Sequence, residues 1–172
     1  MTDDELKHLV ASLAIAQKQT DKQIKELGKQ IGGLGEKFGS FTEGMAFPSM
    51  RKVLQEQFSM EAITTRYIVR KDGKTLELDV LAYANGSAQT AMIVEVKSHL
   101  REEHIDHLLT VLKEVKDYLP EHANKQFYGI LAVVDAQDTL KTQVLNKGLY
   151  YAEIHDDVFA LKVPNGFQAR AF

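Results

Sequence analysis

The sequence predicts an α/β domain built on a mixed β-sheet with helices on both faces, preceded by a long coiled-coil helix. Three observations predict this organisation. A heptad pattern of apolar residues runs through the first 38 residues. Helix-like and strand-like segments then follow in the order helix, hairpin, helix, strand, helix, strand, which is typical of a mixed sheet between helices. Residues 128–134 form a nearly continuous apolar run, as expected of a strand that is covered on both faces.

The first segment has apolar residues spaced alternately four and three apart. The predicted seam comprises Leu6, Val10, Leu13, Gln17, Thr20, Ile24, Leu27, Ile31, Leu34 and Phe38. β-Branched residues at a and leucine at d favour a parallel two-stranded coil, and Gln17 and Thr20 would weaken the seam while fixing its register. We therefore expect residues 1–38 to form a homo-oligomer, with a dimer favoured. The alternative is an amphipathic helix that packs on its own domain.

The predicted globular domain covers residues 39–164 and the predicted tail covers 165–172. Its first helix spans 41–58, where Pro48 should kink or restart it. Strands at 76–80 and 91–97 should pair as a hairpin, because Asn85-Gly86 between them is a turn signal. The remaining predicted elements are a short strand at 67–69, helices at 105–119 and 139–147, and strands at 128–134, 149–154 and 158–163. The tail is expected to be poorly ordered.

Composition limits the class of protein. Apolar residues make up 44% and charged residues 26% of the 172 residues, as in ordinary globular proteins. The chain has no cysteine, which excludes disulfides and fits a reducing compartment. No apolar run approaches the roughly 20 residues of a membrane span, so we expect a cytoplasmic protein with no membrane association. A net charge of −3 argues against a basic coat for non-specific nucleic-acid binding, but it leaves room for a nuclease with a local basic rim.

Charged residues inside apolar strands mark the candidate site. Alternation along a strand places Glu95 and Lys97 on one face, and likewise Glu77 and Asp79 on one face. Charges among valine, isoleucine and leucine cost free energy unless they are paired or hold a metal. The alternative to a functional site is a structural ion-pair cluster. For Glu77 the alternative is a solvated carboxylate at the sheet edge.

These charged residues resemble a known pattern. Glu43 on a first helix, Asp79 on one strand and Glu95-Val96-Lys97 on the next resemble the PD-(D/E)XK signature of the restriction endonuclease-like nuclease superfamily. Leu78 stands where the motif's name has proline. The ordered segments also resemble an uncharacterised prokaryotic family of these domains, in which a coiled-coil helix commonly comes first. They are 38–43, 77–80, 94–97, 128–132 and 146–150.

The resemblance implies hydrolysis of phosphodiester bonds, with DNA as the expected substrate. It implies that Asp79, Glu95, the Val96 carbonyl and Glu43 hold Mg²⁺, for which Mn²⁺ is a substitute. It also implies that Lys97 orients the attacking water or stabilises developing negative charge. One alternative is a catalytically silent nuclease-like interaction module. Another is the cleavage subunit of a larger complex, in which a protein partner supplies the targeting.

A second cluster lies at the start of the predicted helix 105–119. Residues 102–107, with sequence Glu-Glu-His-Ile-Asp-His, contain helical pairs that resemble metal ligands. A solvated helix face explains them better. His104 nevertheless follows closely on the strand that carries Lys97, so it is placed to approach the path of a phosphate, as are Ser98, His99 and Arg101.

Overall fold

The computed structural model describes residues 6, 8, 10, 12–13, 16–20, 22–23, 47–86, 89–155 and 158–172. The chain divides into two compact units, Met1–Phe38 and Gly39–Phe172. In the first unit every described residue is helical. Its seam residues Leu6, Val10 and Leu13 are 43%, 57% and 60% exposed. Seam residues from Ile24 onward lie outside the described residues, so the coiled coil and the oligomer remain predictions.

A mixed six-stranded sheet forms the framework of the second unit, as predicted. The strands are ordered β1-β2-β3-β4-β5-β6. Pairing is antiparallel across β1, β2 and β3, parallel from β3 through β4 to β5, and antiparallel between β5 and β6. The strand bounds are β1 Ala62–Lys71, β2 Lys74–Tyr83, β3 Thr90–His99, β4 Gln126–Asp135, β5 Tyr150–His155 and β6 Val158–Leu161. Strand β1 is therefore considerably longer than the predicted strand at 67–69.

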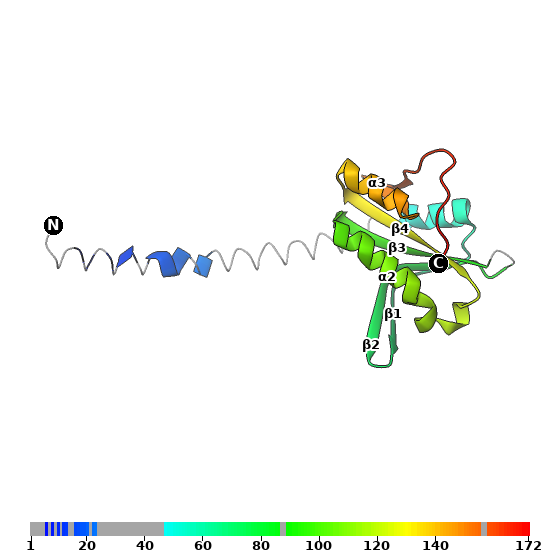
Figure 1. Ribbon diagram of the computed structural model, residues 1–172, viewed down its shortest axis with the longest axis horizontal. Coiled ribbons are helices and arrows are strands. Elements are labelled where there is room, and N and C mark those ends of the chain that lie inside the picture. Colours follow the sequence, from blue (N-terminus) through cyan, green and yellow to red (C-terminus); the bar gives the residue numbers. More distant parts are fainter. Residues whose placement is uncertain are drawn as a thin grey trace. The chain divides into compact units, whose positions relative to one another are not determined.

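Helices cover both faces of this sheet (Figure 1). Helices α2, Glu102–Tyr118, and α3, Asp138–Asn146, pack on one face. The short 3-10 helix η1, Pro120–His122, connects α2 to β4. The helical segment 47–58 covers the other face through Met50 and Leu54, which are fully buried. None of the helices in the described part of the chain is long and apolar enough to cross a membrane.

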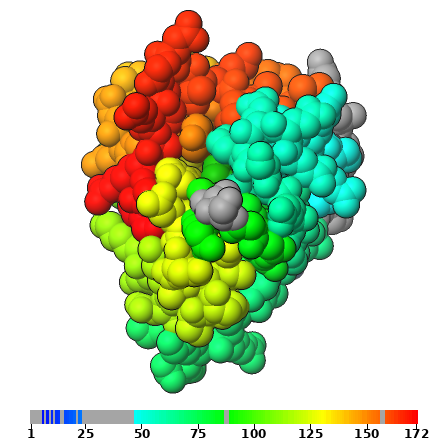
Figure 2. Space-filling model, turned by 90° about the vertical axis from the view of Figure 1, so that its right-hand side faces the viewer, coloured from blue at the N-terminus to red at the C-terminus, as the bar shows by residue number. Residues whose placement is uncertain are grey.

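The hairpin of β1 and β2 extends beyond the rest of the sheet (Figure 1). Strand β2 pairs with β3 only from Val80↔Val94 to Tyr83↔Ala91, whereas it pairs with β1 along nearly its whole length. The first half of β2 therefore belongs to a two-stranded ribbon. Figure 2 shows the tip of this ribbon protruding at the bottom of the molecule. The ribbon leaves the sheet at Asp79, just beyond the last β2–β3 pair, Val80↔Val94.

The end of the chain corrects one expectation, because the predicted poorly ordered tail is docked on the domain. Phe127 and Phe172 exchange two backbone hydrogen bonds of 3.1 and 3.0 Å. Strand β5 pairs with β4 only from Ile130 onward. The start of β4 therefore has polar backbone groups open on that side, and the tail satisfies them. The prediction failed because these partners are 45 residues apart and leave no local pattern.

Gly148 carries the second contact of the tail and provides a stability test. Its φ is +78°, and a Cβ added there would lie 2.5 Å from Cβ of Arg170. Gly73 has φ of +77° but open space around its Cβ position. Both alanine variants should lose about 1–2 kcal/mol through the left-handed backbone. Gly148→Ala should lose about 1 kcal/mol more of its free energy of unfolding, because the new Cβ displaces the tail. Urea denaturation measures both, and equal losses would contradict the docked tail.

Candidate active site

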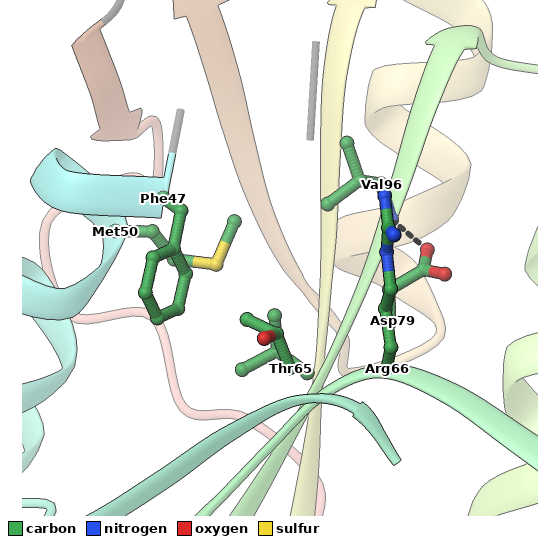
Figure 3. Close-up of a pocket in the computed structure, with 7 residues that line it drawn as sticks. Phe47, Met50, Thr65, Arg66, Asp79 and Val96 are labelled. Atoms are coloured by element: carbon green, nitrogen blue, oxygen red, sulfur yellow. Dashed lines mark hydrogen bonds between the residues drawn. The ribbon is translucent and has the colours of Figure 1, made fainter. Parts of the chain in front are cut away.

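The candidate site lies where strands β2 and β3 part. Ladder pairing between these strands ends at Val80↔Val94. Just beyond that point, the Val96 N–H donates a hydrogen bond of 2.8 Å to Asp79 Oδ2 (Figure 3). A buried backbone N–H needs a partner, and the Asp79 carboxylate supplies one where the neighbouring strand no longer does. The side chain of Asp79 is thereby fixed against the backbone of β3.

Glu95 and Lys97 flank Val96 on β3 and form an ion pair. Lys97 Nζ lies 2.6 Å from Glu95 Oε1. The pair confirms that the two side chains project together, as the strand alternation predicted. Glu95 is only 7% exposed, and it is one of two buried polar or charged residues among those that the structure describes, the other being Lys125. A carboxylate this deep in an apolar sheet requires a compensating charge.

Burial and a neighbouring carboxylate set the electrostatics. Burial raises the pKa of Glu95, and the negative charge of Asp79 raises it further, while Lys97 and His107 act in the opposite direction. Asp79 and Glu95 are thus close enough to repel each other. The net effect is a pKa of Glu95 above its ordinary value, and a cation placed beside both carboxylates would relieve their repulsion.

The beginning of α2 contributes His104 to the surroundings of Lys97. Burial and the nearby charge of Lys97 lower the pKa of His104. Its Nδ1 accepts a hydrogen bond of 3.2 Å from the Arg101 N–H, which leaves the proton of the neutral ring on Nε2. The interpretation of residues 102–107 as a solvated helix face is therefore incomplete, because His104 is partly buried beside the candidate site.

A cavity opens beside Asp79 on the face of the sheet that the helical segment 47–58 covers. It has a volume of about 250 Å³ and is lined by Phe47, Met50, Thr65, Arg66, Asp79, Val80 and Val96 (Figure 3). Sequence reasoning missed Arg66, which adopts φ of +52° within strand β1. No sequence signal marks it, because an arginine in an alternating strand reads as a solvent-facing residue.

The other predicted residues have different outcomes. Glu77 is exposed and lies opposite Ile68 on the hairpin, which agrees with the alternative of a solvated carboxylate. Glu43 lies outside the described residues, so its place in the site stays a prediction. His99 forms a 3.2 Å contact through Nδ1 with Oδ2 of Asp135 on the exposed end of the sheet.

The described residues fit a divalent cation in chemistry, though they form an incomplete set. Among the described residues there is no group of three or more histidine, aspartate or glutamate side chains arranged to hold a metal. Two carboxylates, Asp79 and Glu95, raise each other's energy when both are charged. The Val96 carbonyl between the two motif residues adds a third oxygen. Hard oxygen donors of this kind suit Mg²⁺, which keeps several of its own waters.

Comparisons with known proteins return structures but no family. No family model matches the sequence, and no curated protein matches it. A repair endonuclease from Pyrococcus abyssi is 14% identical, with a TM-score of 0.42 over 63% of this chain and 46% of that one. A protein of unknown function, AF1548, is 16% identical, with a TM-score of 0.43 over 63% of this chain and 58% of that one.

A smaller solved structure also matches. The fdxN element excision controlling factor protein from Anabaena variabilis is 15% identical, with a TM-score of 0.40 over 67% of this chain and 95% of that one. The chain spans about half the length of the first two matched structures. All three matched structures are less than 25% identical to this chain and have TM-scores below 0.5.

Proposed function

We propose that this protein is a metal-dependent nuclease that hydrolyses phosphodiester bonds, with DNA as its substrate. The observation that carries the proposal is the hydrogen bond from the Val96 N–H to Asp79 Oδ2. That bond holds one carboxylate against the strand segment that presents Glu95 and Lys97. Two carboxylates and an ammonium are thereby gathered where β2 leaves the sheet, in the order that the PD-(D/E)XK resemblance implies.

Asp79, Glu95, the Val96 carbonyl and Glu43 would hold Mg²⁺, with Mn²⁺ as a substitute. When bound, the cation lowers the pKa of water and offsets negative charge on the phosphate. Lys97 Nζ, already held at 2.6 Å from Glu95 Oε1, supplies a positive charge at the edge of the carboxylate pair. That charge can orient water or stabilise the negative charge that develops on the phosphate oxygens. His104, neutral with its proton on Nε2, can donate a hydrogen bond to a phosphate oxygen.

The test is cleavage of labelled single- and double-stranded DNA with Mg²⁺, Mn²⁺ or EDTA. Asp79→Asn keeps an oxygen that can accept the Val96 N–H but removes the charge, so we expect the cleavage rate to fall by a factor of about 100 to 1,000. Asp138→Asn, the same change on a carboxylate of α3 whose side chain is 97% exposed, should cut like wild type. Metal-independent cutting, or equal cutting by Asp79→Asn, would contradict the proposal.

If the wild type does not cut, the alternatives gain weight. These are a catalytically silent interaction module, and a cleavage subunit that needs a protein partner for its targeting.

We further propose a homo-oligomer through residues 1–38, because the exposed apolar residues Leu6, Val10 and Leu13 lie on described helical positions of the predicted seam. A cytoplasmic location is part of the same proposal, and the absence of cysteine from the sequence supports it.

A further inference from the structure

The β1–β2 hairpin has an inner and an outer face. On its inner face Tyr67, Val69, Leu76 and Leu78 pack into the core beneath α2. Strand alternation turns the intervening residues to the other side. That outer face carries the cross-strand pairs Ile68↔Glu77 and Arg70↔Thr75. All four of these residues are exposed.

Helix α2 holds this ribbon in place. The Lys71 ammonium donates a hydrogen bond to the backbone carbonyl of Asp117 near the end of α2. Tyr67 and Val69 add apolar contacts to the same side of the core. A ribbon supported along its inner face keeps its outer face fixed relative to the sheet, which two isolated strands would not do.

The outer face leads directly to the candidate active site. Register pairs Thr65↔Val80 and Tyr67↔Leu78 place Arg66 opposite Asp79. Both Arg66 and Asp79 line the cavity beside Val96. Ile63 packs against the core beneath the helical segment 47–58, whereas Tyr67 packs against the core beneath α2. Arg66, with its left-handed φ, lies between these two residues in the sequence. At Arg66 the inward-pointing side of β1 therefore switches from one face of the sheet to the other.

Charge and exposure on this face point to a polyanion. On the outer face the basic residues are Arg66 and Arg70, against the acidic residue Glu77. The cross-strand pair Lys71↔Lys74 lies on the inner side, near the acidic residues Glu114 and Asp117 of α2. Beyond Asp79 the outer face thus carries two guanidiniums against one carboxylate, in a chain whose net charge is −3. Ile68, between Arg66 and Arg70 along β1, is 59% exposed. An apolar side chain flanked by two guanidiniums suits a DNA groove, where thymine methyl groups lie between two phosphate backbones.

We propose that the outer face of the β1–β2 hairpin binds duplex DNA by entering a groove beside the candidate active site. The inference rests on the proposed function and adds the substrate form to it. The major groove of B-DNA is about 12 Å wide and admits a two-stranded ribbon. Arg66 and Arg70 contact phosphates, and Ile68 contacts base edges. The groove contact brings the backbone of the duplex to Asp79.

The experiment measures DNA binding separately from cutting. A labelled duplex and a labelled single strand of the same length are titrated in EDTA by fluorescence anisotropy, at two salt concentrations. Arg70→Glu should weaken duplex binding by about tenfold or more and reduce its salt dependence. Lys113→Glu is the matched control, because Lys113 is exposed on α2 and lies near Gly148 and Arg170 rather than near the hairpin. It should bind like wild type.

Two milder variants protect the test against misfolding. Ile68→Thr keeps a β-branched side chain at an exposed position, and Arg70→Gln removes the charge without reversing it. Both should unfold at the temperature of the wild type and still bind the duplex more weakly. Melting curves monitored by circular dichroism verify the fold of each variant.

The results separate this inference from the proposed function. Duplex binding by Arg70→Glu that equals binding by Lys113→Glu overturns the hairpin inference, even if the wild type cuts DNA. A preference of the wild type for single strands overturns it too. A wild type that neither binds nor cuts DNA overturns both. If Arg70→Glu loses self-association while its DNA binding is intact, the hairpin inference is overturned, and the exposed edge of β1 makes a protein contact instead.

Discussion

Lys97→Gln is expected to lower the rate of Mg²⁺-dependent DNA cleavage by a factor of about 100 to 1,000. The physical reason is the place of the ammonium, 2.6 Å from the buried Glu95 carboxylate. Glutamine retains most of the length of lysine and can still donate a hydrogen bond, but it carries no charge. The measurement is the single-turnover rate on labelled DNA at saturating metal.

The sheet supplies a matched control for this substitution. Lys141 Nζ lies 3.1 Å from Glu153 Oε1, and its side chain is 31% exposed against 30% for Lys97. Register pairs Lys97↔Val133 and Val133↔Glu153 place the two ion pairs at one level of the sheet, two strands apart. Lys141→Gln removes the same kind of pair and should cut like wild type. Equal losses in the two variants would mean that the ion pairs matter only for folding.

Glu95→Gln is expected to abolish cleavage while it stabilises the fold at neutral and alkaline pH. Burial and the charge of Asp79 raise the pKa of Glu95 above its ordinary value of 4.5. Ionisation of this carboxyl is therefore less favourable in the folded protein than in the unfolded chain. A neutral amide of nearly the same shape avoids that cost. The variant is thus expected to lose activity and gain stability at once, because the charge that the proposed metal site needs is also costly to bury.

The pH dependence follows from the direction of the shift. A carboxyl with a raised folded pKa contributes most stability below its unfolded pKa, near 4.5, where both states hold the proton. That contribution is lost as the pH rises through the folded value. The difference in melting temperature between Glu95→Gln and wild type should therefore be close to zero at pH 4 and increase toward pH 8. Melting curves without metal at both pH values measure it, and a constant difference would contradict the interpretation.

Much of the sheet was predictable because its strands carry strong local patterns. The continuous apolar run of β4 and the turn at Asn85-Gly86 between β2 and β3 act over short distances. The charged residues of β3 were identifiable for the same reason, since alternation alone places Glu95 and Lys97 together. Helix α2 likewise shows a clear apolar repeat. These features needed no knowledge of tertiary structure.

Contacts between distant segments were not predictable in this way. Arg66 faces Asp79 only because β1 pairs with β2 in a particular register. His104 lies beside Lys97 because α2 folds back over the sheet, and the sequence shows a polar helix start that is equally typical of a solvated face. The docking of Phe172 on Phe127 depends on where β5 stops pairing with β4. In each case the information lies in the fold rather than in spacing.

The hydrogen bond between Asp79 and Val96 gives one side chain two separate duties. Its oxygen completes the backbone bonding of the sheet where β2 departs, and its charge belongs to the proposed metal site. An Asp→Asn change, which needs only a single nucleotide, would remove the second duty and keep the first. Changes to shorter or apolar residues would remove both. Under the proposed function, loss of cleavage in descendants of this chain is therefore expected to begin with asparagine at this position, because that change keeps the acceptor for the Val96 N–H.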